Sequence, residues 1–322
     1  MVDPAGPGAR LPAELAVLVV VLTFRRPQHI TALVPLLLQQ AEAVRGEGKY
    51  RVDVLVVDND PAGTARSTLA GQLDRIRYVC EARPGIAAAR NRALAEAVAH
   101  DVLVFIDDDE RPSSAWLREL LRTYSTSKSA AVAGPVESRA REAMHPWVAA
   151  TGVFNRSHRN GLDTGARVSM AASNNLLLDL RVVRRHELGF AEWLGMSGGE
   201  DTLFTRALTA RGEAIVWCAE AVVTEELTPD RLTVRYVLRL CFSHGNTAAR
   251  VEMALASGWR RWGTRIAFFG QGGARVAAGS ARWLIGLAMN SLPRRASAAT
   301  TLFRGLGMLL AAVGYRFQEY AR

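Results

Sequence analysis

Short apolar runs alternate with amphipathic stretches along the first third of the chain. The runs at 15–22, 52–57, 76–80 and 101–106 have the length and β-branched content of buried strands. Between them, apolar side chains recur at helical spacing, first at Ile30, Leu33, Val34, Leu37 and Leu38, then over 63–73 and 86–99. This rhythm predicts an α/β fold with a mostly parallel sheet covered by helices on both faces.

The middle of the chain is less regular. A helix is expected over 113–124, with Ser113 or Ser114 as its N-cap, and another over 200–211. Strands are expected at 130–136, 172–178 and 214–218. Residues 137–170 show no periodicity, and a loop of this length inside a compact fold is commonly functional, for example as a substrate lid.

From Thr228 onward the pattern is helical and amphipathic. Arg231, Arg235 and Arg239 lie on one side of the first helix, opposite its apolar positions. Two later apolar segments, 283–292 and 306–315, are shorter than the roughly 20 residues that cross a bilayer. We therefore expect a flexible tail at 1–14, an α/β domain at 15–227 with halves meeting near residues 112 and 113, and a basic helical region at 228–322.

Charge is distributed unevenly over the 322 residues. The net charge of +9 divides into −2 for residues 1–226 and +11 for residues 227–322, where 14 arginines face only three acids. Such a basic region favours nucleic acid or an anionic membrane surface, and no nucleic-acid-binding motif accompanies it. We expect a peripheral membrane surface; the alternative is a helical subdomain packed on the rest of the protein, with its arginines in water.

The cysteines and the N-terminus indicate a reducing compartment. Cys80, Cys218 and Cys241 are odd in number and far apart, so neither a disulfide framework nor a zinc cluster is supported. The first 14 residues carry acids and lack the basic-then-apolar order of a signal peptide. A cytoplasmic location is therefore expected.

Acidic and polar residues follow several of the predicted strands. Thr23 follows the first, Asp58 the second, and Asp107, Asp108 and Asp109 the fourth. Ligands bind at the carboxyl edge of such sheets, and three adjacent carboxylates repel one another unless a cation or donor groups compensate. The pattern favours a metal-diphosphate site for a nucleotide; the alternative is an acidic turn. A P-loop and a GxGxxG motif are both absent.

Six motifs occur in a characteristic order between Leu15 and Gly245. They are VVVLTFRRP (19–27), VLVVDND (54–60), RPGIAAARNRAL (83–94), FIDDDERP (105–112), ASNNLLL (172–178) and SGGEDTLFTRALTARG (197–212). In this order they resemble glycosyltransferase family 2, the inverting enzymes of the GT-A fold. The segment VVTEELTPDRL (222–232), followed by RLTVRYVLRLCFSHGNT (231–247), looks most like the exopolysaccharide and succinoglycan-type members of that family. The resemblance implies a GT-A catalytic domain at 15–227, with the nucleotide-sugar-binding half about 15–112 and the acceptor-binding half about 113–227.

The resemblance also implies roles for single residues. Asp201 resembles the catalytic base, which takes the proton of the acceptor hydroxyl. Asp58 resembles the carboxylate that reads the base, Asp107 the acid near ribose and metal, and Asp109 the direct metal ligand. The remaining implied donor-binding residues are Thr23, Arg26, Arg83, Arg90 and Asp108, and those of the acceptor loop are Asn174, Asn175, Gly199 and Glu200.

Two departures from the family pattern affect the metal site and the product. Many relatives place a histidine after the last strand as a metal ligand, whereas this chain has Glu225 and Glu226 there; His244 is a further candidate. The QxxRW motif of processive synthases is absent, which favours addition of a single sugar.

The reaction that the resemblance implies is transfer from a nucleotide sugar, expected to be a UDP-sugar, with Mg2+ or Mn2+. The expected acceptor is a lipid-linked saccharide at the inner face of the cell membrane. Alternatives are a soluble natural-product acceptor, with the C-terminal helices binding the acceptor or forming a homodimer. A metal-dependent nucleotidyltransferase and a catalytically silent binding module are the alternatives from other classes.

Overall fold

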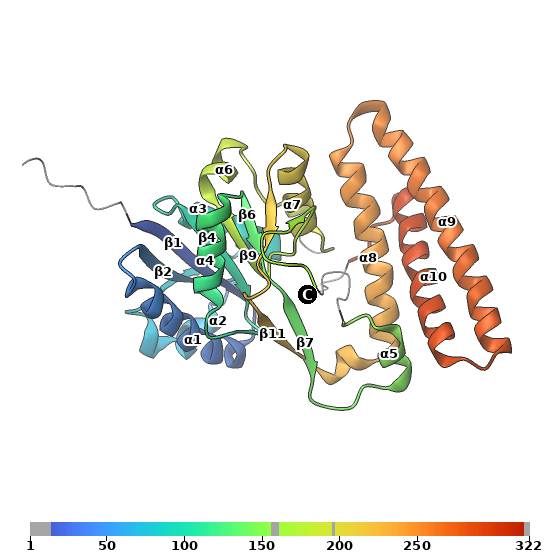
Figure 1. Ribbon diagram of the computed structural model, residues 1–322, viewed down its shortest axis with the longest axis horizontal. Helices are drawn as coiled ribbons and strands as arrows, with labels where there is room; N and C mark the ends of the chain where they lie inside the picture. The colour runs from blue at the N-terminus through green and yellow to red at the C-terminus, as the bar shows by residue number, and fades with distance from the viewer. Residues whose placement is uncertain (1–13, 156–160, 195–196, 319–322) are drawn as a thin grey trace, which may run out of the picture.

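The computed structural model describes residues 14–155, 161–194 and 197–318. Its centre is an eight-stranded sheet in the order β3-β2-β1-β4-β9-β6-β10-β8, with helices on both faces (Figure 1). The strands are β1 (Leu15–Thr23), β2 (Tyr50–Asp58), β3 (Arg77–Cys80), β4 (Val102–Asp107), β6 (Ala131–Ala133), β8 (Arg167–Val168), β9 (Asn175–Asp179) and β10 (Ile215–Trp217). This confirms the predicted α/β fold with a mainly parallel sheet. The predicted tail falls almost wholly on residues 1–13, outside the described residues.

The N-terminal half of the sheet is parallel, as predicted. β1 pairs with β2 and β4, and β2 with β3, all in parallel. Helix α1 (Pro27–Arg45) buries the predicted stripe from Ile30 to Leu38 against the sheet and contains Pro35. Helix α3 (Ile86–Glu96) covers the opposite face with Ala87, Ala89 and Ala93. Two short helices, α2 (Thr64–Thr68) and the 3₁₀ helix η1 (Ala70–Gln72), replace the single helix expected over 63–73.

The second half of the sheet is mixed. β9 runs antiparallel between β4 and β6, and it begins at Asn175 rather than at the predicted residue 172. Helix α4 (Trp116–Ser127) starts later than expected and has Ala115 at its N-cap without a side-chain bond, so the predicted serine cap is wrong. Helices α6 (Leu180–Arg185) and α7 (Glu200–Ala210) flank this half, with the 3₁₀ helix η3 (Glu192–Leu194) between them in sequence.

A second, three-stranded sheet lies beside the carboxyl end of β4. Its order is β5 (Glu110–Pro112), β11 (Val223–Leu227) and β7 (Val136–Ala140). The unpatterned segment 137–170 thus supplies β7 and β8 and, between them, helix α5 (Pro146–Thr151). Val148 of α5 packs against Val237 and Cys241 of the C-terminal helices. Part of this segment therefore joins the sheets to the helical region.

The C-terminal region forms an antiparallel helical body beside the sheets (Figure 1). After the 3₁₀ helix η4 (Pro229–Leu232) come α8 (Val234–Leu255), α9 (Gly258–Ala288) and α10 (Leu292–Ala312). Glycines on α9 at seven-residue spacing, Gly272, Gly279 and Gly286, are buried against α10. None of the helices in the described part of the chain combines the length and the hydropathy that a membrane crossing requires.

Candidate active site

The three aspartates at the end of β4 differ in their surroundings. Asp108 is buried; its carboxylate accepts a hydrogen bond from Thr23 Oγ1 at 2.8 Å and one from Arg26 Nη1 at 3.1 Å. The same Arg26 nitrogen lies 3.2 Å from Asp109 Oδ2. The middle aspartate therefore anchors the turn to the end of β1, and its neighbours lie on either side of this anchor.

Asp107 lies where the acids of the site converge. Its pKa is raised to about 7: burial raises it most, Arg90 lowers it, and Asp109, Asp108 and Asp201 raise it. Asp201 comes from the first turn of α7, so the strand-end acids and the predicted base lie within electrostatic reach of each other. Uncompensated negative charge of this kind favours a cation.

Asp201 is held at the start of α7. Its Oδ1 accepts a bond from the backbone N–H of Thr202 at 2.6 Å. Gly199 precedes the helix with φ +92°, a left-handed conformation that favours glycine, and a Cβ there would collide with Thr247 of α8. The glycine thus lets α8 pack directly against the turn that carries the acid.

Glu200 and Arg90 form a buried ion pair next to Asp201. The side chains are 5% and 4% exposed, and Arg90 Nη1 bonds Glu200 Oε1. Burial raises the pKa of Glu200 to about 7 in spite of Arg90. Arg90 also stacks on the ring of Phe190, with 5.5 Å between Cζ and the ring centroid. The pair joins the predicted donor-binding helix α3 to the predicted acceptor loop.

Arg83 makes a second connection between the same two parts. Its Nε bonds Glu81 at 3.0 Å and its Nη1 bonds Glu192 of η3 at 2.9 Å. Asn91, one residue after Arg90, donates to the backbone oxygen of Phe190 at 2.9 Å. Residues 190–192 are therefore held against the loop and helix that the sequence assigned to the donor.

Asp58 is fully buried at the end of β2. Its carboxylate accepts bonds from Tyr78 Oη at 2.7 Å and from the backbone N–H groups of Asp60 and Ala65 at 3.0 and 2.9 Å. These bonds fix the loop after β2. The predicted contact between Asp58 and the nucleotide base stays a prediction, and it would require one of these donors to be exchanged.

The two asparagines of the β9 segment have different partners. Asn174 Nδ2 donates to Glu110 at 2.7 Å, close to the aspartates. Asn175 is buried, accepts from Trp116 Nε1 at 2.8 Å and donates to the backbone oxygens of Pro135 and Ala221. Asn175 therefore ties β9 to its neighbours, and only Asn174 reaches the acidic cluster.

Glu110 is a residue of this site that the sequence reasoning missed. It is 1% exposed, accepts from Asn174, and accepts from the backbone N–H of Asp107 at 3.3 Å. Burial and then Asp107 raise its pKa well above the usual range. Its position directly after the three aspartates in FIDDDERP was the available signal.

Glu225 and Glu226 point to opposite sides of β11, as neighbours on a strand do. Glu225 is buried, accepts from Ser138 Oγ, and lies 3.6 Å from Arg231 Nη1. Arg231 Nη2 in turn lies 3.4 Å from Asp109. Glu226 pairs with Arg141 instead. Of the two, Glu225 is thus the one connected to the aspartates, through an arginine that the sequence reasoning did not select.

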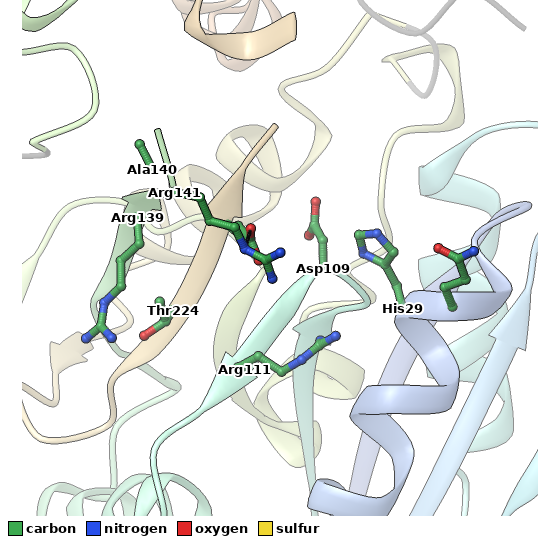
Figure 2. Close-up of a pocket in the computed structure, with 9 residues that line it drawn as sticks. His29, Asp109, Arg111, Arg139, Ala140, Arg141 and Thr224 are labelled. Carbon is green, nitrogen blue, oxygen red and sulfur yellow. Dashed lines mark ion pairs between the residues drawn. The ribbon is translucent and has the colours of Figure 1, made fainter. Parts of the chain in front are cut away.

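A cavity of about 550 Å³ opens beside Asp109 (Figure 2). Figure 2 shows Asp109 and His29 on one side and Arg139 and Arg141 on the other, with Arg111 below. The full lining is Gln28, His29, Asp109, Arg111, Arg139, Ala140, Arg141, Thr224 and Glu226. The cavity therefore places three arginines and the carboxylate of Glu226 next to the predicted metal ligand Asp109.

The acids fit a divalent cation only in part. In the regions that the structure describes, no group of three or more His, Cys, Asp or Glu side chains is arranged to hold a metal ion. Asp107 and Asp109 provide two carboxylates; the pKa of Asp107 is raised first by burial and then by the neighbouring acids Asp109, Asp108 and Asp201, against the opposing effect of Arg90. Mg2+ commonly binds through one or two carboxylates plus substrate phosphates. The two carboxylates fit such a shared site. His244, the further candidate ligand, is exposed on α8.

Comparisons with known proteins agree with this arrangement. The model of the family described as Glycosyl transferase family 2 matches residues 18–170. Succinoglycan biosynthesis protein ExoM of Rhizobium meliloti (strain 1021) is 31% identical over 254 residues, which cover 77% of this chain and 79% of that protein.

Two solved structures show the same fold. Mannosyltransferase PcManGT from Pyrobaculum calidifontis, in complex with GDP-Man and Mn2+, has a TM-score of 0.60 at 17% identity. The match covers 92% of this chain and 86% of the mannosyltransferase chain. S. aureus TarS 1-349, in complex with UDP, has a TM-score of 0.51 at 12% identity, with coverages of 88% and 90%. By its similarity over most of its length to ExoM and by its fold, the chain belongs to glycosyl transferase family 2 and is a glycosyltransferase.

Proposed function

We propose that this glycosyltransferase transfers one sugar from a nucleotide sugar to an acceptor hydroxyl with inversion, and that a divalent cation supports donor binding. The observation that carries this proposal is the convergence of Asp107, Asp109 and Asp201 from β4 and α7 on one site. Two of these acids would hold the cation that binds the donor diphosphate, and the third would take the proton of the acceptor hydroxyl, as a metal-dependent inverting transfer requires.

Asp201 is the proposed base. Its carboxylate takes the proton of the acceptor hydroxyl as that oxygen attacks the anomeric carbon, and the bond to the diphosphate breaks on the opposite side. Glu200 is not the proposed base, because its carboxylate is buried and already paired with Arg90. A cation held by Asp107 and Asp109 would stabilise the charge on the leaving diphosphate.

The donor is proposed to be a UDP-sugar held by Thr23, Arg26, Asp58, Arg83, Arg90 and Asp108. Arg26 and Arg231 now neutralise Asp108 and Asp109, and each guanidinium can turn toward phosphate oxygens once a donor is bound. The similar structures contain either UDP or GDP-Man, so both nucleotides belong in a binding screen.

The acceptor is proposed to be a lipid-linked saccharide at the inner face of the cell membrane. Support comes from the outer face of α9, where Trp259, Trp262, Ile266 and Phe269 recur at helical spacing and are 80%, 65%, 70% and 52% exposed. Arg260 and Arg261 lie exposed among them. Aromatic side chains next to arginines suit the headgroup region of an anionic membrane.

The test separates the two acids by donor binding and by transfer. Asp201→Asn should lose transfer by at least a thousandfold while the protein still binds UDP-sugar with Mn2+ or Mg2+. Asp109→Ala should lose the part of donor binding that depends on the cation. Calorimetric titration of each variant with candidate UDP- and GDP-sugars measures donor binding, and release of the nucleoside diphosphate in the presence of a lipid-linked saccharide measures transfer. Retained transfer in Asp201→Asn would overturn the base assignment, and equal binding with and without cation would overturn the metal assignment.

A further inference from the structure

Arg250 on α8 is a buried arginine whose charge the described residues leave uncompensated. Its exposed fraction is 6%. Among residues 14–155, 161–194 and 197–318, no atom accepts a hydrogen bond from its Nη1 or Nη2. A buried charge without a partner costs several kcal/mol, and an anion bound beside it would offset this cost.

The groups around Arg250 increase its need for an anion. The charged side chain that acts on it is Arg316, beyond the end of α10; burial and then Arg316 lower the pKa of Arg250. The Cζ of Arg250 lies 5.6 Å from the ring centroid of Trp193 in η3, and this tryptophan is 52% exposed. A half-exposed indole therefore lies against Arg250, and a second cation lies within electrostatic reach of it.

Arg316 is held there by Asn246, one helical turn before Arg250. Asn246 is buried; its Nδ2 donates to the backbone oxygen of Tyr315 at 3.1 Å, and its Oδ1 accepts from the backbone N–H of Phe317 at 3.3 Å. These bonds fix the residues on both sides of Arg316. The backbone on both sides of Arg316 is thus fixed beside α8, which keeps this arginine within electrostatic reach of Arg250.

The same turn of α8 also contacts the predicted acceptor loop. Thr247 packs against Gly199, two residues before Asp201. Trp193 follows Glu192, which bonds Arg83. In Figure 1, α8 stands between the helix α7 that carries Asp201 and the helices α9 and α10. An anion bound at Arg250 would therefore lie on the acceptor side of the site.

We propose that Arg250, Arg316 and Trp193 bind the sugar-diphosphate part of the acceptor. The two guanidinium groups bind phosphate oxygens, and the exposed part of the indole packs against an apolar face of the sugar. This inference rests on the proposed function, and it adds the chemical group by which the acceptor is recognised.

Binding is measured by calorimetric titration of the full chain in EDTA, so that the cation-supported donor site is not filled. The probes are inorganic pyrophosphate and glucose linked through a diphosphate to a short, water-soluble prenyl alcohol. Arg250→Met should weaken binding of the glycosyl diphosphate at least tenfold, and Arg316→Met at least threefold. The control is Arg235→Met, which removes the same charge from an exposed position of α8 and should leave binding within twofold.

Three results would overturn the proposal. The wild type binds neither probe at millimolar concentration, or the wild type and Arg250→Met bind the glycosyl diphosphate equally. The third is that the wild type binds pyrophosphate but not the glycosyl diphosphate. If Arg250→Met does not fold, Arg250→Lys gives the same comparison, because lysine keeps the charge but lacks the forked donor. Titration with UDP-sugar and Mn2+ is the separate readout. If the wild type does not bind UDP-sugar with Mn2+, the proposed function is refuted. If it binds UDP-sugar but neither diphosphate probe, this inference alone is refuted.

Discussion

At the scale of single residues, identical side chains in the sequence have different tasks because their partners differ. Asp107 and Asp108 are adjacent, yet one is surrounded by acids and the other accepts bonds from Thr23 and Arg26. The sequence places the triplet at a strand end, which predicts its location. The division of roles depends on partners more than 80 residues away, and no spacing rule reports those.

Glu200 provides a test of this environment through pH. Its pKa is about 7 in the folded protein against a usual 4.5, so the folded state binds the extra proton between these values. Folding stability from this group is therefore present below about pH 4.5 and is lost as pH rises to about 7. Glu200→Gln removes the titration. Relative to that variant, the wild type should lose roughly 1–3 kcal/mol of unfolding free energy between pH 4.5 and pH 8.

Urea unfolding of both proteins across this pH range measures the difference. The matched control is Glu142→Gln, at an exposed position, whose stability should follow the wild type. If the wild type instead gains stability relative to Glu200→Gln as pH rises, the attraction of Arg90 outweighs burial and the stated direction is wrong.

At the scale of elements, the long segments were predicted closely and the short ones only in part. β1, β2, β4 and α1 bury long runs or stripes, so their pattern is set by the core they enter. β6 and β10, of three residues each, lie inside the strands predicted at 130–136 and 214–218, whereas β8, of two residues, is too short to show a period. The antiparallel direction of β9 is set by pairing with β4 and β6. Arg231 was missed because its role comes from a contact between η4 and the turn after β4, which the sequence does not report.

The contact between α9 and α10 depends on glycine, and this gives a second test. A Cβ added to Gly279 would lie 2.9 Å from the Cβ and backbone nitrogen of Leu302. Gly273 on the same helix has open space at that position. Gly279→Ala should therefore destabilise the protein, whereas Gly273→Ala should stabilise it by about 0.5–1 kcal/mol through helix propensity.

Thermal unfolding of the two alanine variants beside the wild type decides this. Both variants replace glycine by alanine in α9, so helix propensity changes equally in the two. A lower melting temperature for Gly279→Ala and a higher one for Gly273→Ala would therefore report the packing of α9 on α10. Equal effects of the two variants would mean that α10 moves away at no cost and that close approach is not required.

At the scale of the whole molecule, the C-terminal helices place their small residues inside and many of their large apolar residues outside. Gly272, Gly279 and Gly286 of α9 face α10, while Trp259 and Trp262 of the same helix are exposed. Helix α9 lies at the outer edge of the molecule (Figure 1). The sequence predicted a basic amphipathic region, but not which face would be covered, since that follows from the packing of α9 on α10.

This arrangement predicts binding to anionic vesicles through α9. Replacing Trp259 and Trp262 together by serine should reduce the fraction that floats with phosphatidylglycerol-containing vesicles at least fivefold, because the indole rings supply the buried apolar area. Val98→Ser, at a position 77% exposed beyond the end of α3, is the control and should float like the wild type. Raising the salt concentration should weaken binding of the wild type, since the arginines act through charge. If the wild type does not float, and sedimentation shows a dimer that the double variant loses, the outer face of α9 binds a second copy of the chain instead.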